Sequence, residues 1–415
     1  MANIRPFRAI RPTKGKEDQI AALPYDVYNR AEAKEEVKDK PLSFLRIDRA
    51  ETNFPDEVDI YSDEVYQKAH DLLWEQVQNG DYVTEDAPCY YIYELTMDGR
   101  TQTGIVACAS IDDYESDVIK KHENTRAEKE KDRIRHVDTV GAQTGPIFLA
   151  YRNRKDIDDV VTKVKAQEAL YDFAADDGVR HRVFVISSPE DISTIQSSFL
   201  RCDAIYIADG HHRAASAVKV GQKRRSEHPG YTGEEEFNFF LSVLFPEQEL
   251  AILDYNRVVK DLNGYEASEF LEELENVVDI LETKAVSEAD ELRPKKKGQF
   301  TMLLDDTWFL CEIKDEFKNE DPVDGLDVAL LQNLVLEPML GILDPKTDAR
   351  IDFVGGIRGY GELIKRTHDD MRIAFAMYPT QILELFAVAD ANRLMPPKST
   401  WFEPKLRSGL FIHQI

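Results

Sequence analysis

Pairs of short apolar segments joined by Asp-Gly constrain the fold of this chain more than any other feature of its sequence. Residues 89–97 and 100–108 flank Asp98-Gly99, and Asp177-Gly178 precedes a further apolar arm at 183–186. Asp-Gly readily adopts the positive φ angles of a two-residue hairpin turn. Apolar runs of this length between turn residues are typical of strands. We therefore expect antiparallel hairpins at both places.

Helical patterns alternate with these strands. Residues 62–79 place Val65, Ala69 and Leu73 on one face and end at Gly80. Asn29 and Glu32 have the spacing of a capping box, which predicts a helix start. Further helices are expected at 214–220, 326–339, near 362 and at 383–390, and further strands at 4–10, 42–47, 146–151, 204–208, 238–245, 302–304, 308–313, 350–354 and 372–377. This mixture favours an α+β fold with mixed sheets and hairpins over a purely parallel sheet.

The length of 415 residues suggests two to three domains at about 150 residues each. The weakest seam lies between 285 and 300, where residues 293–298 are polar and carry turn residues. The pattern fits a linker and the approach to a hairpin equally well. We predict a first region over 1–285 and a C-terminal α/β region over 286–415.

The charge of the chain limits its partners. Lys and Arg number 52 and Asp and Glu number 78, so the formal net charge is −26. Such a protein is not expected to bind nucleic acid or an anionic membrane over a broad surface. No apolar run approaches the roughly 18 residues of a membrane span, and the N-terminus lacks the apolar core of a signal peptide. The four cysteines stand singly in apolar runs, which predicts reduced core residues of a cytoplasmic protein.

The most informative motif is the run Asp209-Gly-His-His-Arg213, which follows an apolar strand and opens an Ala-rich helix. Amide groups at a helix start point outward unpaired, and the helix dipole favours negative charge there. Gly210 permits a tight turn and close approach of a phosphate, while Arg213, His211 and His212 add donors. We expect an oligophosphate or a phosphorylated product here. Alternatively, Asp209 caps the helix, or the two histidines bind a metal ion.

A basic segment, 120–136, contains His122-Glu123 where a short strand passes into a charged helix. Many of its charges belong to a solvated helix face. A glutamate among cations stays ionised and can accept a proton or bind an ammonium group. Glu123 is therefore a candidate base.

Three other segments can line a site. Residues 143–147 form a turn that offers the Thr144 hydroxyl. Tyr25 and Asp26 lie in a Pro-containing turn and can contact a ligand, although an Asp in such a turn usually accepts hydrogen bonds from its own backbone. Near the C-terminus, Lys398, Ser399 and Thr400 offer a charged group and two hydroxyls that can contact an anion. The same segment can also serve to pack the C-terminal part against the rest of the protein through Trp401 and Phe402.

Taken together, these motifs resemble a widespread prokaryotic family labelled as a domain of unknown function, which is similar to the free L-serine kinases of the ParB/sulfiredoxin-like superfamily. The 209–213 run stands as it does in those kinases, where it holds nucleotide phosphates. His122-Glu123 resembles the His-Glu pair whose glutamate is their proposed base, 144–148 resembles the turn and strand that follow, and 395–405 resembles their Pro-Lys-Thr-Thr loop beside the serine site. The resemblance implies that 1–285 is a ParB/sulfiredoxin-like catalytic core, that 149–205 and 221–390 are large insertions, and that the last segment of the C-terminal region, 395–410, returns to the site.

The resemblance and the residues together predict a nucleotide-dependent kinase that converts free L-serine to O-phosphoserine. ATP or ADP is the expected donor, with Mg²⁺ bridging its phosphates. The expected catalytic residues are Glu123, Asp209 and His122. The expected phosphate-binding residues are Asp209, Gly210, His211, His212 and Arg213, and Asp209 is also a candidate metal ligand. The expected substrate-binding residues are Thr144, Lys398, Ser399, Thr400 and Arg407. A phosphoserine hydrolase and a non-enzymatic, nucleotide-sensing ParB-like regulator remain alternatives.

Overall fold

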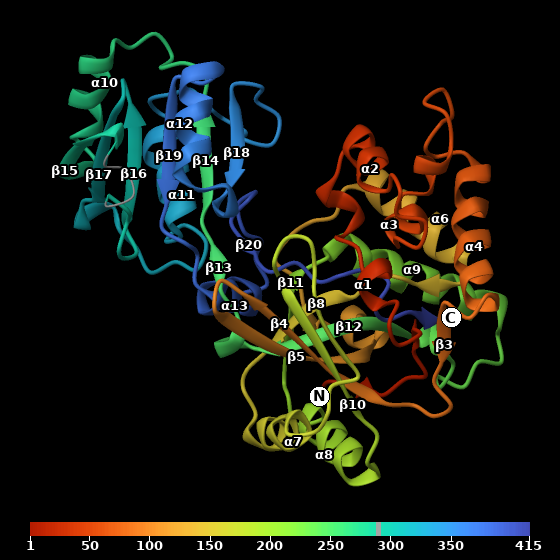
Figure 1. Ribbon diagram of the computed structural model, residues 1–415. Coiled ribbons are helices and arrows are strands. Elements are labelled where there is room, and N and C mark those ends of the chain that lie inside the picture. The colour runs from red at the N-terminus through yellow and green to blue at the C-terminus, as the bar shows by residue number, and fades with distance from the viewer. Residues whose placement is uncertain (288–291) are drawn as a thin grey trace. The chain divides into compact units, whose positions relative to one another are not determined.

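The computed structural model describes residues 1–287 and 292–415 and divides the chain into two compact units (Figure 1). The first unit comprises Met1–Leu250 and Pro404–Ile415, and the second comprises Ala251–Glu403. The division does not fall at the predicted residue 285, because β15 (Val278–Ala285) pairs with β17 (Thr307–Ile313) inside the second unit. Part of the predicted seam, residues 288–291, lies outside the described residues.

Strands and helices alternate along the first unit. Its strands are β1 (Ile4–Arg5), β2 (Ile10–Pro12), β3 (Tyr82–Thr84), β4 (Tyr90–Met97), β5 (Arg100–Ser110), β6 (Ile119–Lys120), β7 (Ala142–Gln143), β8 (Ile147–Tyr151), β9 (Tyr171–Ala174), β10 (Arg180–Ile186), β11 (Ile205–Asp209), β12 (Phe239–Pro246) and β21 (His413–Gln414). Its α-helices are α1 (Glu17–Ile20), α2 (Arg30–Glu36), α3 (Leu45–Asp48), α4 (Asp63–Gln78), α5 (Ile111–Glu115), α6 (Ala127–Val140), α7 (Lys155–Lys165), α8 (Pro189–Phe199) and α9 (His211–Glu227).

A mixed sheet forms the centre of the first unit. Its strand order is β6-β11-β8-β12-β5-β4-β10-β9, and β1 pairs with β5. The predicted hairpins are confirmed, since β4 pairs antiparallel with β5 across Asp98-Gly99 and β9 with β10 across Asp177-Gly178. Helix α9 packs on β12 and on α6, which places the charged α6 beside the Ala-rich helix (Figure 1). Mixed sheets with hairpins confirm the expected mixture of α and β structure.

The predicted helix at 62–79 is confirmed as α4, and the Asn29 capping box is present at the start of α2. The predicted strand at 42–47 is wrong. Phe44, Leu45 and Ile47 are buried in an apolar cluster with residues of α4, and the segment forms α3. A short apolar run is ambiguous between helix and strand, and packing against α4 decides it. The predicted strand at 4–10 is interrupted after β1, because Pro6 has no N–H to donate.

The second unit contains its own sheet. Its strands are β13 (Ile252–Leu253), β14 (Tyr255–Val259), β15, β16 (Gln299–Leu304), β17, β18 (Ile351–Gly355), β19 (Ile373–Met377) and β20 (Trp401–Phe402), and its α-helices are α10 (Ala267–Leu274), α11 (Asp327–Leu331), α12 (Gly359–Asp369) and α13 (Ile382–Asp390). The large sheet has the order β15-β17-β16-β19-β14-β18. The helix predicted over 326–339 is shorter, because α11 passes into a π-helical turn at Gln332–Leu336.

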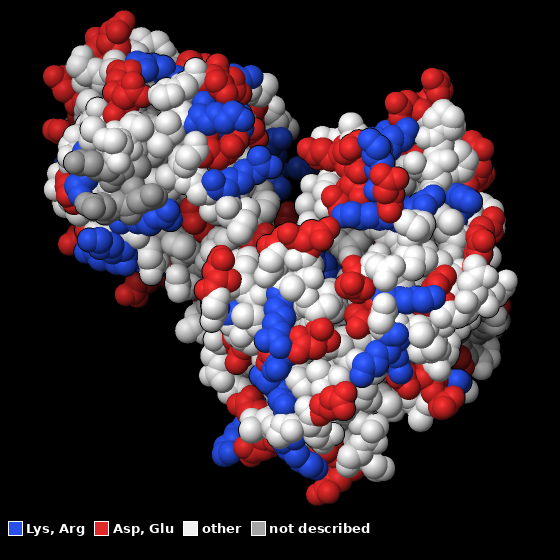
Figure 2. Space-filling model, in the orientation of Figure 1, with Lys and Arg blue, Asp and Glu red and all other residues white. Residues whose placement is uncertain are grey.

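Several composition-based expectations can be checked against the structure. All four cysteines are free and buried, as predicted. Within the part of the chain that is described, no helix combines the length and apolar character needed to cross a bilayer. On the face shown in Figure 2, acidic and basic side chains alternate without a broad basic surface.

Candidate functional site

The pairing of three strands brings the sequence motifs to one edge of the sheet. Strand β6 runs parallel to β11, with Ile119 opposite Ile205, so the residues that follow both strands emerge together. Strand β8 runs antiparallel to β11, with Phe148 opposite Asp209, so the turn before β8 meets the same edge. His122-Glu123, the 209–213 run and the Thr144 turn therefore converge, although the first two are separated by more than eighty residues.

Gly210 makes the turn from β11 into α9. Its φ angle is +94°, in the left-handed region that glycine adopts without strain. Its amide N–H donates to Asp209 Oδ1 at 2.8 Å, and no side chain caps the first turn of α9. The alternative that Asp209 caps this helix is therefore wrong, because the N-cap residue is Gly210 and the one backbone amide that Asp209 is seen to accept from, that of Gly210, precedes the first turn. The amides of the first turn stay available to an anion.

Arg213 folds back over this turn. Its Nη1 donates to the carbonyl of Pro146 at 2.6 Å, and its Nη2 lies 3.9 Å from Asp209 Oδ2. A Cβ on Gly210 would come within 3.1 Å of Arg213 Nε. The absence of a side chain at Gly210 thus makes room for the guanidinium beside the helix start.

Lys405, near the C-terminus of the chain, completes the charge arrangement. Its Nζ lies 3.4 Å from Asp209 Oδ2. Burial opposes ionisation of the Asp209 carboxyl, but Lys405 and Arg213 outweigh it and hold the pKa of this group well below its usual range. The result is an ionised carboxylate flanked by two cations at the start of α9.

His122 and His211 form a buried pair beneath this turn. Their rings meet edge to face with centroids 4.4 Å apart, and the His122 amide donates to His211 Nε2 at 3.4 Å. Burial lowers the pKa of His122 to about 4 and that of His211 well below its usual value, to which the neighbouring His122 contributes. His122 Nδ1 is buried and has no hydrogen-bond partner among the described residues. Both rings are therefore neutral at physiological pH.

Glu123 lies on the open side of this pair. Its Oε2 is 3.8 Å from His211 Nδ1, and its side chain is 58% exposed. Because His211 Nε2 accepts a hydrogen bond, the ring proton is assigned to Nδ1, which faces the carboxylate. His212 is arranged similarly, since its Nε2 accepts from the Arg126 amide at 2.9 Å. The second histidine thereby ties the start of α9 to the segment before α6.

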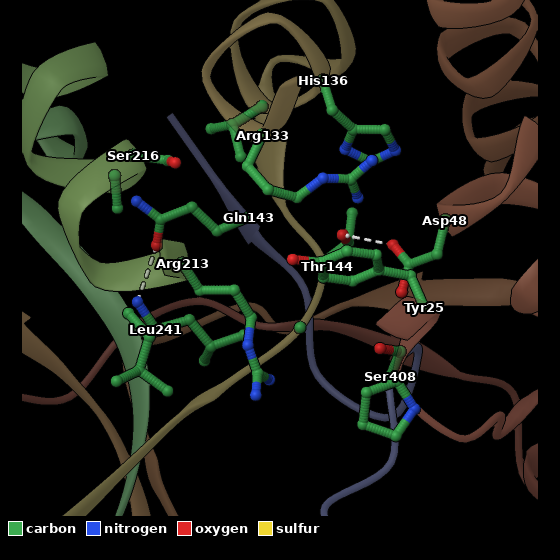
Figure 3. A pocket seen from close by; sticks show the side chains of 15 residues that line it. Tyr25, Asp48, Arg133, His136, Gln143, Thr144, Arg213, Ser216, Leu241 and Ser408 are labelled. Atoms are coloured by element: carbon green, nitrogen blue, oxygen red, sulfur yellow. Dashed lines mark hydrogen bonds between the residues drawn. The ribbon is translucent and has the colours of Figure 1, made fainter. Parts of the chain in front are cut away.

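A pocket adjoins this edge (Figure 3). Thr144, at the turn before β8, lines it and donates its hydroxyl to Asp48 Oδ1 at 2.9 Å. Arg133 of α6 stacks over the ring of Tyr25, with its Cζ 4.1 Å from the ring centroid. The remaining lining includes His136, Arg213 and Ser408. The pocket thus extends from the predicted phosphate-binding arginine to side chains of the N-terminal segment.

Four predicted substrate-binding residues have contacts of their own. Arg407 contacts Asp177 through Nη2 at 2.5 Å and His181 through Nε at 3.3 Å, and it lines a different pocket of the first unit. Lys398, Ser399 and Thr400 belong to the second unit, where the carbonyl of Lys398 accepts from Arg257 at 3.1 Å. Contact of these four residues with the substrate stays a prediction.

The alternative of a histidine-bound metal has no support in the geometry. Among residues 1–287 and 292–415, no group of three or more His, Cys, Asp or Glu side chains could hold an ion. The Asp209 carboxylate contacts the turn into α9 by a hydrogen bond from the Gly210 amide. An ion at this edge would therefore depend on oxygen atoms of a bound nucleotide and on water.

Sequence reasoning missed three side chains that the fold brings here. Lys405 is the only one with a local signal, because it stands in the C-terminal loop that resembles the kinases. Asp48 directly follows a segment predicted as a strand, and Arg133 lay among charges that fit a solvated helix face. Both are buried, which only the packing of α3 and α6 reveals.

The sequence profile of a family described as "Protein of unknown function (DUF1015)" matches residues 4–329. No curated protein matches the chain. Among solved structures, a free serine kinase in complex with AMP is similar at 12% identity, with 72% of this chain and 86% of that chain covered and a TM-score of 0.32.

Two further structures match at the same level. A conserved hypothetical protein from Pyrococcus furiosus has 12% identity, coverage of 73% and 93%, and a TM-score of 0.33. SbnI with a C-terminal truncation, from Staphylococcus aureus, has 12% identity, coverage of 72% and 82%, and a TM-score of 0.34. Scores in this range carry no conclusion about activity.

Proposed function

The chain belongs to the DUF1015 family, and we propose that it transfers a phosphoryl group from a nucleotide to the hydroxyl of free L-serine, giving O-phosphoserine. One observation carries the proposal: the parallel pairing of β6 with β11 sets Glu123 beside the uncapped start of α9, with Oε2 3.8 Å from His211 Nδ1. A carboxylate that can orient a hydroxyl beside a phosphate-binding turn is an arrangement that phosphoryl-transfer enzymes use.

In this proposal the start of α9 binds the nucleotide phosphates. The first-turn amides donate to phosphate oxygens, and the helix dipole adds a favourable field. Arg213 and Lys405 supply positive charge on one side, while Asp209 holds both cations in place. We propose that this strand, turn and helix are the phosphate-binding core of a ParB/sulfiredoxin-like fold, as the Asp-Gly-His-His-Arg resemblance implies.

Glu123 acts as the general base. It accepts the proton of the serine hydroxyl while the serine oxygen bonds to the transferred phosphorus and the bond from phosphorus to the nucleotide oxygen breaks. ATP would leave as ADP, and ADP as AMP. His211 Nδ1 lies 3.8 Å from Glu123 Oε2 and gives the carboxylate a polar neighbour, while the buried His122 packs against His211. Alignment and charge neutralisation supply most of the rate in such reactions.

Mg²⁺ fits this arrangement only as an ion held mainly by the nucleotide. It prefers one or two carboxylates together with phosphate oxygens and water. Asp209 would supply the protein carboxylate, directly or through water. The ion would neutralise charge on the transferring phosphates.

The experiment is incubation of the full chain with ATP or ADP and a panel of hydroxy amino acids, with phosphorylated products identified by mass spectrometry. Glu123→Gln should reduce kcat by roughly two to four orders of magnitude and leave nucleotide affinity nearly unchanged, as expected for a general base. Full activity in this variant would remove the role of Glu123. Arg213→Ala should weaken nucleotide binding as well as rate, and unchanged affinity would count against the phosphate site.

Two outcomes would favour the alternatives. Release of phosphate from phosphoserine without nucleotide would indicate a hydrolase that uses Glu123 to activate water. Tight nucleotide binding without any phosphorylated product would indicate a nucleotide-sensing regulator.

A further inference from the structure

The pocket beside the phosphate site contains two buried side chains of opposite charge that do not pair with each other. Asp48 and Arg133 both line the pocket shown in Figure 3, and both also line the adjoining hollow toward Tyr61 and Tyr66. They therefore stand at the junction of the two spaces. Neither was assigned a role by the sequence motifs.

Arg133 presents one unused nitrogen. Its side chain is only 10% exposed, and its Nε and Nη2 both contact Asp132 Oδ2, at 2.9 and 2.8 Å. Its Nη1 has no acceptor among the described residues. The Tyr25 ring covers one face of the guanidinium and fixes its plane. A planar, fixed guanidinium with a free nitrogen is well suited to a carboxylate.

Asp48 presents one unused oxygen. The residue is 4% exposed, and its Oδ1 accepts the Thr144 hydroxyl at 2.9 Å. Among the described residues no further hydrogen bond and no cation within 4.0 Å reaches this carboxylate. Arg133 supplies positive charge nearby, but no donor reaches the second oxygen, which can therefore accept a hydrogen bond from a ligand. Its neighbour on the ligand should therefore be a donor such as an ammonium group.

We propose that Arg133 and Asp48 form the zwitterion subsite of the acceptor, with Arg133 binding the α-carboxylate and Asp48 the α-ammonium of a free amino acid. The two unmatched groups are complementary to those two charges and to no single ion. Asp48 would repel a second phosphate but attract an ammonium group, which favours the amino acid over the nucleotide as the occupant. Arg213 lines the same pocket, so the subsite adjoins the proposed phosphate site.

The inference rests on the proposed function, and equilibrium binding tests it without requiring turnover. Calorimetry on the full chain without nucleotide would compare L-serine with ethanolamine, which lacks the carboxylate, and with 3-hydroxypropionate, which lacks the ammonium group. Wild-type protein should bind L-serine at least about tenfold more tightly than either analogue, because each loses one charged hydrogen bond. Equal affinity for all three ligands would overturn the assignment.

Two variants locate the contacts. Arg133→Met should weaken L-serine binding about tenfold to a hundredfold and leave ethanolamine binding nearly unchanged. Asp48→Asn, which keeps an acceptor for Thr144, should weaken L-serine but not 3-hydroxypropionate. Lys131→Met removes an exposed charge from the same helix and should change nothing. Arg133→Lys, which keeps the charge, should recover part of the affinity for 3-hydroxypropionate. An equal loss of affinity for all three ligands in either variant would overturn the assignment of Arg133 to the carboxylate and Asp48 to the ammonium group.

The two proposals can fail separately. If L-serine binds with this dependence on Arg133 and Asp48 but no nucleotide phosphorylates it, the subsite stands and the kinase proposal fails. If O-phosphoserine forms and Arg133→Met leaves the KM for L-serine unchanged, the kinase proposal stands and the subsite is wrong.

Discussion

The buried His122 should make the first unit sensitive to acid in a way that one substitution can remove. Burial lowers the pKa of this histidine from 6.5 to about 4 in the folded protein. The unfolded chain therefore binds a proton at a higher pH than the folded chain does. Stability contributed by the neutral ring is present above about pH 6.5 and is lost as the pH falls toward 4.

The size of the effect follows from the two pKa values. With 6.5 in the unfolded chain and about 4 in the folded one, His122 alone should remove about 2 kcal/mol from the free energy of unfolding between about pH 7.5 and pH 5. Only 3% of the surface of His122 is exposed, so solvent screening reduces the expected loss of about 2 kcal/mol little. His122→Gln should lower stability at neutral pH but flatten its decline with acid by that amount.

Hydrogen exchange of peptides from β8 and β11, followed in urea at several pH values, measures this loss of stability. Both strands belong to the first unit, so the exchange reports on that unit by itself. His70→Gln, which removes a histidine from the surface of α4, is the matched control and should keep the wild-type pH dependence. An acid-induced loss of equal size in wild type and His122→Gln would refute the reasoning. His136 and His181, whose pKa values burial lowers to about 4 and about 3, should add to the decline in both proteins.

Three further predictions concern the turn into α9 and the N-terminal segment. Gly210→Ala should destabilise the first unit by about 1–2 kcal/mol, because φ is +94°, and should weaken ADP binding, because a Cβ would lie 3.1 Å from Arg213 Nε. The control is Gly99→Ala, at φ +76° with no atom within 4 Å, which should lower stability alone. Calorimetry with ADP separates the two variants. Lys405→Met removes the cation 3.4 Å from Asp209 Oδ2 and should weaken ADP binding about tenfold, so unchanged affinity would exclude Lys405 from the site. Asn29→Ala breaks the capping box of α2 and should cost about 1 kcal/mol, seen as faster hydrogen exchange in α2; protection equal to wild type would show that packing alone holds this helix.

Local patterns were enough to predict the elements on which the site is built. The strand ending at Asp209, the turn at Gly210 and the helix behind it follow from an apolar run, a glycine and a series of alanines, all within about twenty residues. The same holds for the Asp98-Gly99 and Asp177-Gly178 hairpins. Turn geometry and helix initiation depend on neighbouring side chains and backbone angles, so the local sequence is sufficient to indicate them.

Segments whose own preference is weak were predicted less well. Residues 42–47 contain apolar side chains that suit a strand or a helix, and their burial against α4 selects the helix. Arg133 and Glu130 look like members of a solvated face in the sequence, yet both are buried, Glu130 against α9 and Arg133 against the Tyr25 ring. Periodicity cannot distinguish a solvated charge from a buried one, because the difference lies in what packs against it.

By itself, the sequence determined that a glycine turn with flanking cations opens a helix after a buried strand, and that His122-Glu123 follows another short strand. Only the tertiary structure decided that these strands are parallel neighbours, that Lys405 reaches Asp209 from the far end of the chain, and that Asp48 and Arg133 face one pocket. The physical reason is that strand pairing and charge pairing between distant segments depend on how the whole core packs, whereas turns and helix starts depend on adjacent residues.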